Sequence, residues 1–249
     1  MNDATDQRRM YADLAWTWPL MGGPAESIEE AGEFVAAIRQ HSRIDARTLL
    51  HLGCGGGHLD MTLKQHFAVT SVDLSDAMLA LARRLNPEVA YLPGDMRSAR
   101  LGQTFDAVMI ADSIDYMLSV DDLRAAFETA FAHLKPGGVF CTYAEVTQER
   151  FQQNWTKCST YHHDDLDIAF VHNNYDPDPA DTTHESTFVW LIRRSGKLEI
   201  ETDRHLGGIF PLQTWLDLLQ DVGFDVTLIE PQFEAPMFVC VKCDSQDRF

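Results

Sequence analysis

A short apolar run followed at once by a cluster of glycines is the feature that most constrains the fold of this chain. Thr48 to Leu52 has the pattern of a strand buried on both faces, and Gly53-Cys54-Gly55-Gly56-Gly57 follows it directly. Leu59, Leu63 and Phe67 then recur at the spacing of a helix face, which predicts a helix that begins near residue 58. This order of elements places backbone N–H groups at a positive helix terminus, where a polar or anionic ligand group can bind. A tight turn also needs glycine for purely steric reasons, so a ligand site requires further residues.

An acidic residue at the end of the next predicted strand is such a residue. Val69-Thr70-Ser71-Val72-Asp73 has a second strand pattern, and Asp73 stands 20 residues after Gly53 (73 − 53). An acid at this offset accepts hydrogen bonds from ribose hydroxyls in nucleotide-binding α/β folds. The chain has His58 where the dinucleotide fingerprint G-x-G-x-x-G requires its third glycine. The sequence therefore predicts a cofactor that carries a nucleoside, and it argues against NAD.

The composition argues against several classes of protein. The 249 residues, 45% of them hydrophobic, suffice for one α/β domain with an inserted segment, and no apolar run approaches the length of a membrane span. A formal net charge of −18, without any Lys/Arg cluster longer than a pair, argues against a nucleic-acid substrate. The first six residues are polar and acidic, unlike a signal peptide, and the five cysteines lack framework spacing. We therefore expect a protein of the reducing cytoplasm.

Strand and helix patterns alternate through most of the chain. Ser27 with Glu30 forms a capping-box sequence at the start of one predicted helix, and Ser75 caps another. The remaining predicted elements are strands at 89–92, 105–110, 139–143, 224–229 and 236–241 and helices at 121–133 and 212–222. Helices between successive strands indicate crossover connections and a parallel sheet, so the predicted fold class is α/β.

Residues 145–208 break this alternation. They are rich in His, Asp, Pro and aromatic residues, and Thr187 to Arg193 and Lys197 to Arg204 predict an antiparallel hairpin. We therefore predict two parts. Residues 1–144 and 209–249 form the α/β domain with an N-terminal lid segment, and residues 145–208 form an inserted cap.

Several motifs in order resemble the class I S-adenosylmethionine-dependent methyltransferases: His51-Leu-Gly-Cys-Gly-Gly-Gly, Val72-Asp-Leu-Ser, Gly94-Asp-Met-Arg, Phe105-Asp-Ala-Val and Leu134-Lys-Pro-Gly-Gly. The resemblance covers residues 47–143 and is greatest to small-molecule N-methyltransferases, including the aminosugar dimethyltransferases. It implies a Rossmann-like seven-stranded sheet of order 3-2-1-4-5-7-6 with strand 7 antiparallel. It also implies that the inserted antiparallel β structure caps the substrate at the carboxyl edge of the strands.

The resemblance implies S-adenosylmethionine as the cofactor, bound at the glycine loop. Asp73 would accept from the ribose hydroxyls, Asp95 would accept from the adenine amino group, and Tyr11 would close over the cofactor. The full set of implied cofactor-binding residues is Tyr11, Gly53, Cys54, Gly55, Asp73, Leu74, Met78, Asp95, Met96, Ala111 and Asp112. The chain departs from the family at His51, where Asp or Glu is usual, which puts the usual support of the glycine loop in doubt.

Methyl transfer needs an aligned acceptor, and an amine acceptor must also lose a proton. Tyr116 follows the fourth strand where the aminosugar enzymes carry a His or Tyr, so the resemblance implies that it is catalytic. The other possible bases are Glu145, His162 and His163.

The predicted substrate-binding residues are Trp16, Tyr143, Glu145, His162, His163 and Trp190. If several of these rings, with Trp18, Trp155 and Tyr161, wall one pocket, the acceptor is flat or semi-apolar, such as an aromatic nitrogen heterocycle or an aminosugar. Simple packing accounts equally well for any single ring.

The predicted function is therefore methyl transfer to nitrogen of a small molecule (EC 2.1.1.-). The alternatives are O-methylation, a non-catalytic nucleoside-cofactor-binding protein and an NAD-dependent oxidoreductase. Neither His162-His163-Asp164-Asp165 nor Cys240-Val-Lys-Cys243 has the ligand spacing of a metal site, so we expect no metal. We expect a monomer or homodimer that has no nucleic-acid or membrane partner.

Overall fold

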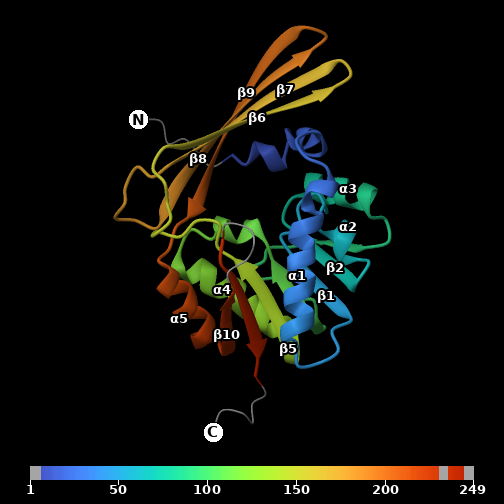
Figure 1. Cartoon of the computed structure of the whole chain (residues 1–249), viewed down its shortest axis with the longest axis vertical. Coiled ribbons are helices and arrows are strands. Elements are labelled where there is room, and N and C mark those ends of the chain that lie inside the picture. The colour runs from blue at the N-terminus through green and yellow to red at the C-terminus, as the bar shows by residue number, and fades with distance from the viewer. Residues whose placement is uncertain (1–6, 230–234, 244–249) are drawn as a thin grey trace.

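The computed structural model describes residues 7–229 and 235–243, which form two β-sheets and their helices (Figure 1). The larger sheet has seven strands in the order β10-β11-β5-β4-β1-β2-β3. Neighbours among β1 to β5 are parallel, and β11 is antiparallel to both β5 and β10. With β10 and β11 as the sixth and seventh strands of the domain, this order confirms the predicted Rossmann-like topology.

The strands of this sheet follow the predicted positions closely. They are β1 (Thr48–Leu52), β2 (Ala68–Asp73), β3 (Ala90–Pro93), β4 (Phe105–Ile110), β5 (Leu134–Tyr143), β10 (Phe224–Ile229) and β11 (Met237–Lys242). The helices are α1 (Ile28–His41), α2 (Asp60–Leu63), α3 (Asp76–Leu85), α4 (Val120–His133) and α5 (Leu212–Val222). No helix in the described residues has the length and apolar character needed to cross a membrane.

Helices cover both faces of the sheet because alternate strand residues point to opposite sides. Leu49 of β1 packs in one apolar cluster with Phe34 of α1 and Leu79 of α3. The next residue, Leu50, packs in the other cluster with Phe127 of α4 and Trp215 of α5. Burial on both faces explains why these strands read as short continuous apolar runs.

The predicted helix starts are only partly right. Ser75 caps α3, since its Oγ accepts from the backbone N–H of Met78 at 3.1 Å. The predicted capping box at Ser27 is wrong, because the Ser27 side chain makes no capping bond and Glu30 instead accepts from the Tyr143 hydroxyl at 2.7 Å.

The helix after the glycine loop is shorter than its apolar spacing predicts. It ends at Leu63, because β2 begins only a few residues later.

The inserted residues form a four-stranded antiparallel sheet of order β6-β7-β8-β9. Its strands are β6 (Trp155–His163), β7 (Leu166–Tyr175), β8 (Thr183–Arg194) and β9 (Lys197–Gly208). The predicted hairpin is confirmed as β8 and β9, whereas β6 and β7 were not predicted. We call this sheet the cap sheet.

The N-terminal segment, residues 7–27, lies between the cap sheet and the larger sheet (Figure 1, blue). It consists of the 3₁₀ helices η1 (Arg9–Tyr11), η2 (Ala15–Leu20) and η3 (Pro24–Ser27). Met10 and Leu14 pack in one apolar cluster with Phe188, Trp190 and other cap-sheet residues. This packing covers one face of the outer part of the cap sheet.

Asp106 of β4 fastens the amino ends of three strands. Its carboxylate accepts from the backbone N–H groups of Arg47 at 3.0 Å and Thr48 at 2.8 Å, and from Lys135 Nζ at 2.7 Å. Burial alone would raise the pKa of Asp106, but the Lys135 ammonium and these backbone donors lower it to about 2. The folded state therefore binds this proton less tightly than the unfolded chain does.

We expect Asp106→Asn to lower the free energy of unfolding at pH 7 by about 2 kcal/mol. The lowered pKa means that the wild-type contribution is full above the unfolded pKa near 4 and is lost as the pH falls toward 2. Urea unfolding at pH 7 and pH 3 measures both effects. The exposed Asp45→Asn, which removes a surface pair with Arg47, is the control and should change stability by less than about 0.5 kcal/mol. Equal effects of the two substitutions would contradict the role of Asp106.

Candidate functional site

A cavity of about 1010 Å³ lies at the carboxyl ends of the parallel strands. The glycine loop after β1, Asp73 at the end of β2 and η4 (Asp112–Tyr116) after β4 form its floor. The N-terminal segment and the inner face of the cap sheet, including Phe170, His172 and His205, form its other walls. The site thus opens where α/β folds bind their ligands, at the end of the strands beside β1.

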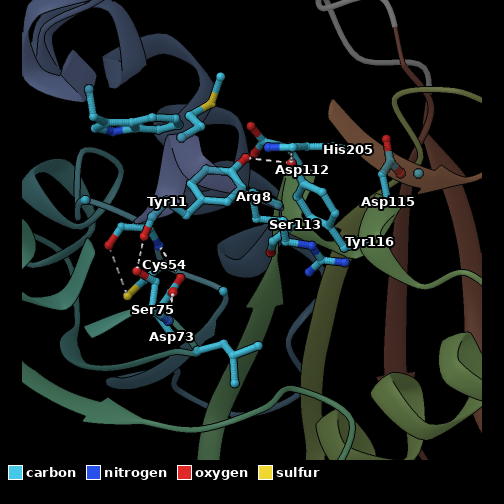
Figure 2. A pocket seen from close by; sticks show the side chains of 18 of the residues that line it. Arg8, Tyr11, Cys54, Asp73, Ser75, Asp112, Ser113, Asp115, Tyr116 and His205 are labelled. Atoms are coloured by element: carbon cyan, nitrogen blue, oxygen red, sulfur yellow. Dashed lines mark hydrogen bonds between the residues drawn. The ribbon is translucent and has the colours of Figure 1, made fainter. Parts of the chain in front are cut away.

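The glycine loop and Asp73 are joined directly. Gly53, Gly55 and Gly57 have φ values of 73°, 53° and 78°, a backbone conformation that favours glycine. Asp73 Oδ2 accepts from the Gly55 backbone N–H at 2.7 Å, and its Oδ1 accepts from the Ser75 N–H at 2.8 Å. Burial raises the pKa of Asp73, although these donors oppose the rise. The Ser75 hydroxyl also donates to the Tyr11 carbonyl, so the N-terminal segment is tied to the same strand end (Figure 2).

A hydrogen-bonded chain of four side chains runs along one wall. Tyr11 and Tyr116 share a bond of 2.8 Å between their hydroxyls, and the Tyr116 oxygen lies 2.7 Å from His205 Nδ1 (Figure 2). His205 Nε2 lies 2.7 Å from Asp203 Oδ2, and both of these side chains are buried. The Arg8 guanidinium carbon lies 4.4 Å from the centre of the Tyr116 ring.

The carboxylate at the end of this chain fixes where its protons lie. Asp203 is ionised, since its bonds to His205 and the Met10 N–H lower its pKa despite burial, and it can only accept. His205 therefore donates through Nε2 and accepts at Nδ1 when neutral. The Tyr116 hydroxyl then donates to His205, and Tyr11 donates to the Tyr116 oxygen.

Four carboxyl groups gather in the same cavity. Glu30, Asp112, Asp115 and Glu145 all line the cavity. Limited hydration, with the charges of Asp112 and Glu30, raises the pKa of Glu145 to about 8. Burial, followed by the charge of Asp112, raises the pKa of Glu30 to about 7. Burial also raises the pKa of Asp115, whose Oδ1 has no hydrogen-bond partner. Such a wall favours a cationic ligand group over an anionic one.

Comparison with known proteins decides the family. The sequence profile of a family described as Methyltransferase domain matches residues 49–138. The dTDP-4-amino-2,3,4,6-tetradeoxy-D-glucose N,N-dimethyltransferase of Saccharopolyspora spinosa is 35% identical over 196 residues, which are 78% of this chain and 77% of the relative. This chain belongs to the class I S-adenosylmethionine-dependent methyltransferases. S-adenosylmethionine is therefore its cofactor, and it is an enzyme.

Solved structures agree with this assignment. Streptomyces venezuelae DesVI superposes with a TM-score of 0.83 at 26% identity, over 94% of this methyltransferase and 98% of DesVI. An amino pentose methyltransferase from Micromonospora echinaspora, solved with S-adenosylmethionine bound, superposes with a TM-score of 0.80 at 26% identity. That likeness covers 97% of this chain and 99% of the other. The cap sheet and N-terminal segment thus belong to the shared fold.

Most residues predicted to bind the cofactor line the cavity of the methyltransferase. They are Tyr11, Gly53, Cys54, Gly55, Asp73, Leu74, Asp95, Met96, Ala111 and Asp112. Met78 is not among the lining residues, because it is buried beneath Gly55 and Gly56 and supports the loop from below. Asp95 also binds Arg97 at 2.6 Å. The binding role of each residue remains a prediction.

The predicted substrate residues divide differently. Glu145 lines the cavity, as do the aromatic Trp18 and Tyr161. Trp190 does not, because it is fully buried against the N-terminal segment and its indole N–H lies 3.0 Å from Met21 Sδ. The others also lie off the cavity wall. Two are aromatic residues that pack elsewhere: the Arg194 guanidinium lies over the Trp16 ring, and Trp155 packs edge-on to His172. The remaining three are held by hydrogen bonds, Tyr143 to Glu30 and Asp112, His162 to Asp167, and His163 to the Leu20 carbonyl. The predicted pocket walled by these rings is therefore only partly formed.

The sequence did not predict His205 and Asp203 as site residues. No motif surrounds them, and only their alternate positions on β9, a strand predicted from its pattern, could have placed both on one face. Among the residues that the structure describes, no group of three or more His, Cys, Asp or Glu side chains could hold a metal ion.

We expect Asp73→Asn to weaken S-adenosylhomocysteine binding by about 1.5–3 kcal/mol, because a charge-assisted hydrogen bond to the ligand is lost. Isothermal titration calorimetry measures this directly. Asp121→Asn removes the same charge from an exposed position in the first turn of α4, away from the cavity lining, and serves as the control. An unchanged dissociation constant in Asp73→Asn would refute its binding role.

Proposed function

We propose that this methyltransferase methylates the amino nitrogen of a small sugar-like amine. The observation that carries the proposal is that one cavity holds both a wall of carboxyl groups and the Tyr11–Tyr116–His205–Asp203 chain. The first can hold a cationic amine and the second can take its proton. The aminosugar specificity of the Saccharopolyspora relative supports the same class of acceptor.

The residues present fit S-adenosylmethionine. Asp73 would accept from the ribose hydroxyls, the glycine loop would contact the methionine half, and Met96 and Asp95 would flank the adenine. The cofactor, when bound, supplies a methyl group on a sulfonium that leaves as a neutral thioether. Tyr11 bonds to the start of α3 through its carbonyl and to Tyr116 through its hydroxyl, so it would close over that cofactor. In the same arrangement, residues 145–208 would serve as the substrate cap.

The proton path follows from the hydrogen-bond directions. The Tyr116 oxygen would accept an N–H of the amine. The bound ammonium gives a proton to Tyr116 while the Tyr116 proton passes to His205 Nδ1, and the nitrogen lone pair freed in this way forms the new N–C bond. The resulting imidazolium is stabilised by the Asp203 carboxylate, 2.7 Å from Nε2. Tyr116 is the proposed catalytic base, and His205 and Asp203 position and polarise it.

The five cysteines support the reducing cytoplasm as the compartment of this enzyme. All five are free thiols, and three of them are buried among apolar side chains. Thiols of this kind persist where disulfides do not form.

We expect Tyr116→Phe to lower kcat by roughly 10²-fold, because the acceptor for the amine proton is removed. Affinity for S-adenosylhomocysteine should stay within about twofold of wild type, since the hydroxyl acts on the acceptor side. Steady-state kinetics with a panel of aminosugars, together with calorimetry, separates the two. Tyr161→Phe removes a hydroxyl from the cap-sheet wall outside the relay and is the matched control. Normal turnover by Tyr116→Phe would remove it from the mechanism.

We expect the KM for an amine to fall as the pH rises through about 8. Limited hydration within the cavity and the neighbouring carboxyls raise the pKa of Glu145, so it is mostly neutral below that pH and a carboxylate above it. The carboxylate attracts the protonated amine, and Glu145→Gln should flatten the pH dependence of KM. Kinetics between pH 6.5 and 9.5 measures it. If Glu145→Gln kept the wild-type profile, another group would have to explain it.

A further inference from the structure

His51 is a polar side chain that is buried away from solvent. It precedes the glycine loop on β1, is fully buried, and forms part of the cavity wall. Its Nδ1 lies 2.7 Å from Asp60 Oδ1, and Asp60 is also fully buried. The other Asp60 oxygen accepts from the Ser71 hydroxyl at 2.8 Å. His51 Nε2 has no hydrogen-bond partner.

An unpartnered buried nitrogen needs an explanation, since leaving one costs about 1–3 kcal/mol. The Asp60 carboxylate can only accept, so Nδ1 carries the proton of the bond between them. In the neutral ring Nε2 then has a free lone pair. Asp60 and Ser71 fix the orientation of this ring, and the residue forms part of the cavity wall.

The position of His51 in the sheet indicates which group it meets. Its strand lies between β2, which carries Asp73, and β4, which leads to Asp112. Glu30 and Asp73 line the same cavity as His51. An acceptor surrounded by carboxyl groups favours a cationic N–H donor. The amino-acid half of S-adenosylmethionine carries such a donor, its α-ammonium group.

We propose that His51 Nε2 accepts a hydrogen bond from the α-ammonium group of the cofactor. A neutral imidazole held by Asp60 would thus stand where the family usually has a charged carboxylate. The inference rests on the cofactor site within the proposed function and is independent of which acceptor is methylated.

The test compares two ligands that differ in the amino-acid part. S-adenosylhomocysteine carries the α-ammonium group, whereas 5′-methylthioadenosine keeps the nucleoside and lacks the amino acid. His51→Asn keeps an amide that can reach Asp60 and removes the atom at Nε2. Calorimetry on the full chain should find S-adenosylhomocysteine weakened about tenfold to a hundredfold and 5′-methylthioadenosine changed less than threefold.

Equal weakening of both ligands would assign His51 a purely structural role, and no weakening would also overturn the proposal. Should His51→Asn unfold, ¹⁵N NMR of the wild-type histidines replaces it. The His51 Nε2 signal should then shift with S-adenosylhomocysteine and stay unchanged with 5′-methylthioadenosine, and the same shift with both would count against the proposal. If no amine were methylated, the difference between the two ligands would still stand, so the two proposals fail separately.

Discussion

Close contact between the backbone of the glycine loop and three separate segments is the constraint on which this site depends. A Cβ at Gly53 would lie 2.0 Å from Ser113 Oγ, which follows β4. A Cβ at Gly56 would lie 2.8 Å from Trp18 of the N-terminal segment, and one at Gly57 would lie 2.7 Å from the Tyr91 hydroxyl of β3. Because the loop has no side chains at these positions, β3, η4 and the N-terminal segment can all meet at the end of β1. That meeting creates the floor of the cavity.

The proton relay also joins the parts of the fold. Tyr11 comes from the N-terminal segment, Tyr116 from η4, and His205 with Asp203 from the cap sheet. The Asp203 carboxylate accepts from the Met10 N–H as well as bonding to His205, so it holds the N-terminal segment against the cap sheet. The bonds that close the cavity are therefore the same bonds that polarise Tyr116. Loosening either wall would also disturb the proton path.

The sequence predicted what local pattern determines and missed what tertiary packing determines. The strands of the large sheet were placed well because burial on both faces makes them short apolar runs. β6 has mostly exposed positions, so its residues lack the alternation that marks a half-buried strand. Trp190 and Phe188 lie on one face of β8, yet Met10 and Met21 cover the tryptophan while Phe188 lines the cavity. Nothing in the pattern of β8 alone separates the two.

The carboxyl groups and the proton relay have different consequences for the rate. In methyl transfer to an amine, one positive charge moves from sulfur to nitrogen, so the reactants, the transition state and the immediate product all carry a cation in the cavity. Glu30, Asp112, Asp115 and Glu145 favour positive charge in each of these states, and such uniform binding lowers KM without raising kcat. Limited hydration, together with the mutual repulsion of these carboxyls, raises the pKa of Glu145 and Glu30, and a bound cation relieves the repulsion. Tyr116 acts on the proton that must leave the nitrogen before the new bond forms. The rate advantage therefore depends on the relay and on alignment, while the carboxyl wall selects which molecules enter.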